Sequence, residues 1–204
     1  MRISKKYELI FLSTPKAGSH TGWKLMEDNF SPIVVSNMHY NIVPTQYINY
    51  NAFTIVRNPY DRAVSLWNSL LWAHLTAKPN KMHIAKRYRK VFLDKVKSDK
   101  FEDFTEWLAK SRQINSDFYT KFEMSQTKYH STSNIKCKYF QLENINNTLP
   151  KYLLEKTGVQ ISSIPCELKR KHESWHELKT DKARDNIIRW AEKDFESYGY
   201  DIDY

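Results

Sequence analysis

Residues 11–21, FLSTPKAGSHT, change from an apolar run into a Pro-Lys pair followed by small and hydroxylated residues. This order is typical of a buried strand, a tight loop and the start of a helix. The amino end of a helix presents unpaired N–H groups and the positive end of the helix dipole, so it suits an anion. Lys16 adds a mobile positive charge, and small Ala17 and Gly18 let the backbone approach closely. The stretch is therefore interpreted as a phosphate-binding loop.

A second signature, FTIVRNPYDRAVS, occupies residues 53–65. Its apolar run ends at Arg57, and Pro59 is suited to the first turn of the helix that follows. In open α/β sheets ligands gather at the carboxyl ends of strands, where the planar guanidinium of Arg57 can grip a phosphate. Ser65 can add a hydroxyl to the same anion, whereas an ion pair with Asp61 is the competing structural use of the arginine. The two signatures together indicate a nucleotide with phosphates at two separated positions.

Composition sets the limits on this interpretation. The chain has 204 residues, of which 41% are hydrophobic and 14% aromatic, so an ordinary globular core is expected. The formal net charge of +9 favours an anionic partner, such as a nucleotide, nucleic acid, sulfated sugar or membrane surface. Cys137 and Cys166 have no disulfide-framework or zinc-ligand spacing. The apolar run near the amino terminus is too short for a signal sequence or a spanning helix, and we expect a soluble cytoplasmic protein.

The remaining pattern alternates strands with helices. Strands are predicted at residues 7–13, 33–36, 52–56 and 138–142. Helices are predicted at residues 19–30, from Pro59 onward, and at 81–97, 101–109, 150–156 and 181–198, the last with Thr180 as its amino cap. This alternation predicts a three-layer α/β/α domain with a central, mainly parallel sheet. We expect one domain over residues 1–204, with residues 76–130 as a variable, mainly helical region on the acceptor side.

Both signatures resemble a known family. Residues 15–21, PKAGSHT, look like the 5′-phosphosulfate loop of the sulfotransferases that use 3′-phosphoadenosine 5′-phosphosulfate (PAPS), although the family more often has Thr or Ser at His20. Residues 53–67, FTIVRNPYDRAVSLW, closely resemble the 3′-phosphate-binding motif of the same family. Residues 139–145 and 187–200 are similar to a later strand and to the carboxyl-terminal helix of the family. The resemblance is closest to the carbohydrate-type members and implies the P-loop NTPase-like sulfotransferase fold.

The resemblance also implies an activity, which is transfer of a sulfuryl group from PAPS to a hydroxyl or amine of an acceptor. The acceptor would be a carbohydrate, such as a glycan or glycolipid, or another small polyhydroxylated molecule. Transfer would be in line, would need no metal and would release 3′-phosphoadenosine 5′-phosphate (PAP). The residues implied in donor binding are Lys16, Ala17, Gly18, Ser19, His20 and Thr21 for the 5′-phosphosulfate, and Arg57 and Ser65 for the 3′-phosphate. Lys16 would also neutralise charge on the bridging oxygen, which makes it catalytic. The run 169–171 is either a further clamp on the 3′-phosphate or a solvated loop.

An acceptor hydroxyl must lose its proton during transfer, so a general base is required. His39 follows the second predicted strand and carries an imidazole, whose ordinary pKa suits proton transfer near neutrality. The family places a catalytic His or Glu in this region. We predict His39 as the base, with His20 and then Glu27 as the next candidates.

Two other functions stay open at this level. A nucleotide or small-molecule kinase with a degenerate phosphate loop would show Mg²⁺-dependent ATP turnover, although the GxxxxGK[ST] pattern is absent. Residues 84–100, IAKRYRKVFLDKVKSDK, combine basic and aromatic residues in a way that could follow a nucleic-acid backbone. No sequence-specific nucleic-acid motif accompanies them, which favours a basic surface helix instead.

Overall fold

The computed structural model describes residues 1–35, 39, 41–75, 96, 98, 100–111, 120–165 and 173–204, without the side chains of 70–75, 120 and 121. These residues divide into two compact units, Met1–Asn58 with Gln126–Arg170, and Pro59–Ser125 with Lys171–Tyr204. The basic helix predicted at 81–97 lies almost entirely outside the described residues, as do Cys166 and the run 169–171. The expectation of a single domain over residues 1–204 stays a prediction.

The first unit is built on a five-stranded sheet. Its strands, in spatial order, are β3 (Ile33–Val34), β1 (Arg2–Ser4), β2 (Leu9–Leu12), β4 (Asn51–Val56) and β5 (Lys138–Gln141). The strands β2, β4 and β5 run parallel, while β1 is antiparallel to both β2 and β3. This arrangement confirms the α/β class with a central, mainly parallel sheet flanked by helices. Strand β1 escaped prediction because three residues with a charged arginine give no periodic signal.

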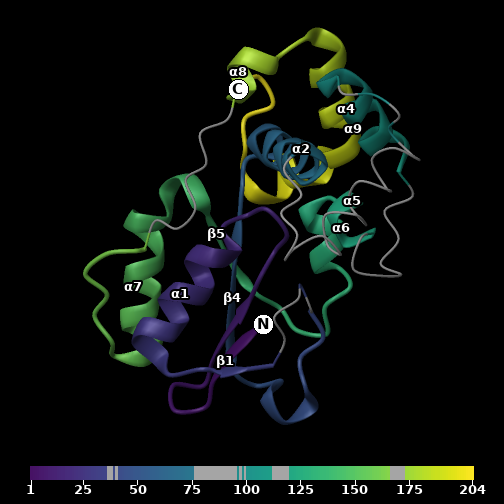
Figure 1. Cartoon of the computed structure of the whole chain (residues 1–204). Coiled ribbons are helices and arrows are strands. Elements are labelled where there is room, and N and C mark those ends of the chain that lie inside the picture. Colours follow the sequence, from purple (N-terminus) through teal and green to yellow (C-terminus); the bar gives the residue numbers. More distant parts are fainter. Residues whose placement is uncertain are drawn as a thin grey trace. The chain divides into compact units, whose positions relative to one another are not determined.

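Side chains of β2 alternate between two apolar layers, one on each face of the sheet. Leu9 and Phe11 belong to a core with α1 (Ser19–Phe30) and α7 (Ile145–Thr157), which lie on the same face (Figure 1). Ile10 and Leu12 belong to a second core with the segment around the short 3₁₀ helix η1 (Thr45–Tyr47). Burial of both faces explains why every residue of β2 is apolar, as expected for a central parallel strand.

Helix α1 has the predicted bounds, whereas α7 begins five residues before the predicted start at Pro150. The predicted start at Pro150 is wrong, because this proline lies inside the helix. Buried Ile145 and Leu149 anchor the turn before it. The helix ends at Thr157, one residue after the predicted end, and its C-cap is Gly158, whose φ of 70° suits a residue without a side chain. Two shorter elements complete the unit, α6 (Gln126–His130) and the 3₁₀ helix η4 (Leu142–Asn144).

The second unit is helical. It contains α2 (Pro59–Leu75), α4 (Phe101–Lys110), α5 (Thr120–Glu123), α8 (Trp175–Leu178) and α9 (Asp181–Tyr198). Tyr60 and Trp175 stack in its core with ring centroids 4.4 Å apart. The buried Trp190 indole donates to the carbonyl of Glu123 at 2.7 Å. Among the described residues, no helix combines the length and apolar composition needed to cross a bilayer.

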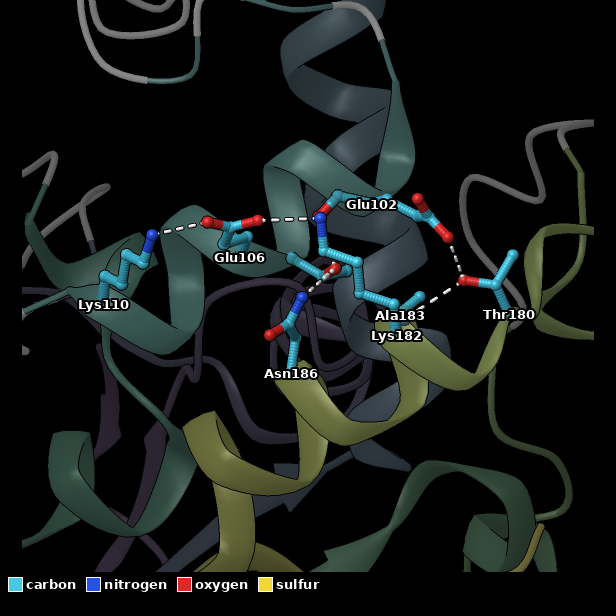
Figure 2. Close-up of polar contacts among 8 residues, drawn as sticks. Glu102, Glu106, Lys110, Thr180, Lys182, Ala183 and Asn186 are labelled. Carbon is cyan, nitrogen blue, oxygen red and sulfur yellow. Dashed lines mark hydrogen bonds and ion pairs between the residues drawn. The ribbon is translucent and has the colours of Figure 1, made fainter.

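Polar contacts join α4 to α9 in this unit (Figure 2). Thr180 accepts from the N–H of Ala183 at 3.1 Å, which confirms the predicted amino cap, and donates to Glu102 at 2.6 Å. Glu106 lies between two lysines, 2.5 Å from Lys110 and 2.9 Å from Lys182. The helices are therefore tied at the first turn of α9 by a cap and by an ion pair.

Glu106 provides a pH-dependent contribution to stability. Hydrogen bonding by Lys110, then by Lys182, lowers the pKa of Glu106 from 4.5 to about 2. A carboxyl with a lowered pKa stabilises the folded state above its unfolded pKa and loses that effect as pH falls through the folded pKa. Glu106→Gln is therefore expected to lower the free energy of unfolding at neutral pH, and this difference from wild type shrinks as pH falls from 4.5 toward 2. Denaturant titrations of both proteins over this pH range measure it.

Glu192→Gln is the control, because it removes an exposed carboxyl from the same unit. A difference between Glu106→Gln and wild type that does not change with pH would contradict the assignment of the effect to this ion pair.

Candidate functional site

The loop between β2 and α1 holds two residues in the left-handed region of backbone space. Lys16 has a φ of 64° and Gly18 a φ of 77°. A non-glycine residue in this region is strained, and such residues cluster at functional sites, although Glu8 and Ser31 also have a positive φ in this chain. A Cβ on Gly18 would lie 2.9 Å from Leu142, so glycine suits both the backbone and the space. The loop is therefore a tight turn that places Lys16 immediately before the helix.

The carbonyl of Thr14 holds this loop together through two hydrogen bonds. It accepts from the N–H of Ala17 at 3.3 Å and from the hydroxyl of Ser19 at 2.7 Å. Ser19 belongs to the predicted 5′-phosphosulfate loop, and its hydroxyl donates to the loop itself. The N-cap of α1, which starts at Ser19, is Gly18, a residue with no side chain to cap the helix. The N–H groups of this first turn and the helix dipole remain the features that suit an anion.

Gly22 determines how closely α1 approaches the sheet. A Cβ at this position would lie 2.1 Å from the Phe11 ring, far inside van der Waals contact. Glycine therefore lets the first turns of α1 pack directly on β2. This contact sets the position of the helix start relative to the carboxyl end of the strand, and the sequence interpretation did not include it.

A buried polar network lies at the start of the loop. The hydroxyl of Thr14 is 2.9 Å from that of Thr54 on the neighbouring strand and 2.7 Å from Nε2 of His130. The hydroxyl of Tyr129 donates to the carbonyl of Ser13 at 3.3 Å. Burial raises the pKa of Tyr129, so this hydroxyl stays protonated and keeps its donor role. The Ser13 hydroxyl is buried and has no hydrogen-bond partner within the described part of the chain.

His39 is oriented by the same strand end. Its side chain is buried, and Nδ1 lies 3.1 Å from the carbonyl oxygen of Ser13. A carbonyl can only accept, so Nδ1 carries the hydrogen in this contact. The neutral ring then has its lone pair on Nε2. This tautomer is the one in which Nε2 can take up a proton.

The rings of His20 and His39 lie close to the indole of Trp23, and Glu27 is paired with an arginine over the same indole. The ring centroid of His20 is 4.9 Å from that of Trp23, and the centroid of His39 is 6.0 Å from it. Arg2 lies over the same indole, with Cζ 5.1 Å from the centroid, and forms an ion pair with Glu27 at 2.9 Å. The Glu27 carboxylate is therefore engaged by a cation. His20 is exposed in the first turn of α1, which suits contact with an anion better than proton abstraction.

Arg57 follows β4 directly, at the same sheet edge as the loop. Because Leu12 pairs with Thr54 in parallel register, the carboxyl ends of β2 and β4 are neighbours. No described acidic side chain forms an ion pair with the guanidinium. Ser65 lies on α2, in the second unit. The joint role of Arg57 and Ser65 stays a prediction from the sequence.

The backbone at Arg57 is held by two side chains from the later part of the chain. The amide of Gln126 accepts from the N–H of Arg57 at 2.9 Å and donates to its carbonyl at 2.8 Å. A carboxylate oxygen of Glu143 accepts from the N–H of Asn58 at 2.8 Å. The sequence interpretation missed both contacts, because no local pattern signals a partner so distant along the chain.

Comparison with known proteins identifies a family. A family model described as the sulfotransferase family matches residues 1–201. No curated protein and no solved structure matches the chain.

Proposed function

Since this chain belongs to the sulfotransferase family, we propose that its sulfuryl donor is PAPS and that its acceptor is a carbohydrate or another small polyhydroxylated molecule. The observation that carries the proposal is the meeting of two anion-binding features at one sheet edge. The loop after β2 leads into a helix whose N-cap, Gly18, has no side chain to cap it, and Arg57 follows the adjacent parallel strand β4. Two separate cationic features fit a nucleotide that carries anionic groups at both its 3′ and 5′ positions.

The loop would hold the 5′-phosphosulfate. Lys16 contributes its ammonium group, and residues 17–21 contribute backbone N–H groups and the dipole of α1. When bound, the donor supplies an activated sulfuryl group. Lys16 would stabilise the negative charge that grows on the bridging oxygen as the S–O bond breaks. The left-handed backbone of Lys16 supports this role, because the fold holds a strained residue at the point where the charge is needed.

The 3′-phosphate would be held by Arg57, with the hydroxyl of Ser65 as a second donor. A guanidinium can give two parallel hydrogen bonds to one phosphate, which provides direction as well as charge. Binding at both ends would position the sulfuryl group for in-line attack. Positioning and charge stabilisation then supply the catalysis.

His39 would act as the general base. Its Nδ1–H is directed to the Ser13 carbonyl, so the imidazole has a defined orientation and presents Nε2 as the basic atom. In the reaction Nε2 takes the proton of the acceptor hydroxyl while its oxygen attacks sulfur. The buried position limits rotation of the ring, which favours a fixed geometry for proton transfer.

His39→Ala is expected to lower kcat by about 10²–10⁴-fold, the usual contribution of a general base. Its affinity for PAP should change little, because the imidazole is assigned to the acceptor and not to the nucleotide. Steady-state rates with PAPS and calorimetric titration with PAP measure the two quantities. The acidic limb of the pH–kcat profile should also disappear in the variant.

His176→Ala controls for the loss of an imidazole, since it removes an exposed histidine from the second unit. If the His39→Ala protein keeps the wild-type rate, His39 is not the general base, and His20 or Glu27 becomes the candidate.

Titration with PAP and incubation with radiolabelled PAPS test the function itself. We expect measurable heat with PAP, transfer of label to one of a panel of glycans and small polyhydroxylated acceptors, and no turnover of ATP with Mg²⁺. Folded protein that has no affinity for PAP would refute the proposal. ATP turnover with Mg²⁺ would instead support a kinase. The cytoplasmic location stays a prediction.

A further inference from the structure

Gln126 makes an unusual contact for a buried amide. It is the first residue of α6, it is 0% exposed, and both of its polar atoms bond the backbone of Arg57. Strand β4 has already ended at Val56, so Arg57 gains from one side chain the two hydrogen bonds that a neighbouring strand would give. We call this pair of bonds the Gln126 clamp.

The next residue is held as well. Glu143, in η4, accepts from the N–H of Asn58 at 2.8 Å. Two elements that both lie far from β4 in the sequence therefore restrain consecutive backbone groups immediately after this strand. The guanidinium of Arg57, in contrast, is only partly buried and forms no ion pair with a described acidic residue. The fold therefore fixes the backbone of Arg57, while the positive charge of its guanidinium is not used in an ion pair with a described acidic residue.

We propose that Gln126 is a positioning residue that directs Arg57 at the 3′-phosphate of the donor, an inference that rests on the proposed function. Paired hydrogen bonds from a guanidinium to a phosphate require a defined angle as well as a short distance. The angle depends on the backbone from which the side chain projects. Loss of the clamp should therefore weaken binding of nucleotides with a 3′-phosphate and should spare nucleotides without one.

The chain contains a matched control for this clamp. Asn134 bonds Val43 in the same manner, accepting from its N–H at 2.8 Å and donating to its carbonyl at 2.9 Å. Val43 is a buried apolar residue of the sheet core and has no proposed contact with the nucleotide. Removal of either amide breaks two backbone hydrogen bonds, but only Gln126 restrains a proposed ligand-binding residue.

The test compares Gln126→Ala with Asn134→Ala in titrations with PAP and with AMP, which lacks the 3′-phosphate. The expected result for Gln126→Ala is a PAP affinity that falls about tenfold more than the AMP affinity, as for a misplaced binding group. Asn134→Ala should leave the ratio of the two affinities at its wild-type value, even where stability falls. Gln126→Met, which keeps most of the side-chain volume without polar atoms, serves as the second variant should the alanine protein not fold.

A Gln126 variant that binds PAP and AMP in the wild-type ratio would overturn the inference and leave the proposed function standing. Wild-type protein that does not bind PAP would overturn the proposed function, and the inference with it.

Discussion

Lys16→Ala is expected to reduce the rate of sulfuryl transfer from PAPS by about 10²–10³-fold, the typical effect of removing one group that stabilises transition-state charge. The reason is that the ammonium group is assigned to the oxygen on which charge develops as the sulfuryl group leaves. Rates with saturating PAPS measure this effect. PAP affinity should fall less than the rate, since the backbone of residues 17–21, which is proposed to bind the 5′-phosphate, is unchanged.

Two further variants separate charge from backbone geometry. Lys16→Gly removes the same amine but suits a φ of 64° better than alanine does, so equal loss in both variants would identify the amine as the cause. Lys24→Ala removes an exposed lysine from the same helix, where it pairs with Asp28 at 2.5 Å, and should leave the rate unchanged. Wild-type activity in Lys16→Gly would remove Lys16 from the mechanism.

Arg57→Ala is expected to weaken PAP binding by about a hundredfold, or ~2.7 kcal/mol, as for loss of charge-assisted hydrogen bonds to a phosphate. AMP and adenosine 5′-phosphosulfate should bind almost as they do to wild type, because neither carries a 3′-phosphate. Calorimetric titration with the three nucleotides measures the contrast.

Arg189→Ala is the appropriate comparison, since it removes an exposed arginine from α9 and lowers the net charge by the same amount. Similar losses for all three nucleotides in Arg57→Ala would mean that Arg57 does not recognise the 3′-phosphate. Similar PAP losses in both arginine variants would assign the effect to overall charge.

Local sequence rules were sufficient for the elements beside the proposed site. Helix α1 and helix α9 begin and end at the predicted residues, because each has a clear start signal and an apolar face with helical spacing. The parallel strands β2 and β4 were found from short apolar runs closed by turn residues. The position of the loop and of Arg57 at strand ends follows from the same pattern.

The rules were insufficient where the signal was short or the partner was distant. Strand β1 has three residues, and the helix predicted to start at Pro150 begins at Ile145. His130 has no local feature that indicates its contact with Thr14, 116 positions away in the sequence. The same holds for Gln126, whose clamp on Arg57 spans 69 positions.

The amino-acid sequence alone was enough for the fold class and for the resemblance to the sulfotransferase family, and it predicted the two anion-binding signatures, because these depend on residues adjacent in the chain. The tertiary structure alone decided which nitrogen of His39 carries the hydrogen, how Thr14 and Ser19 close the loop, and that Gln126 holds the backbone of Arg57. These features depend on hydrogen bonds between groups that meet only when the strands and helices pack. The directions of those bonds set the chemistry of the residues, and no spacing along the chain contains them.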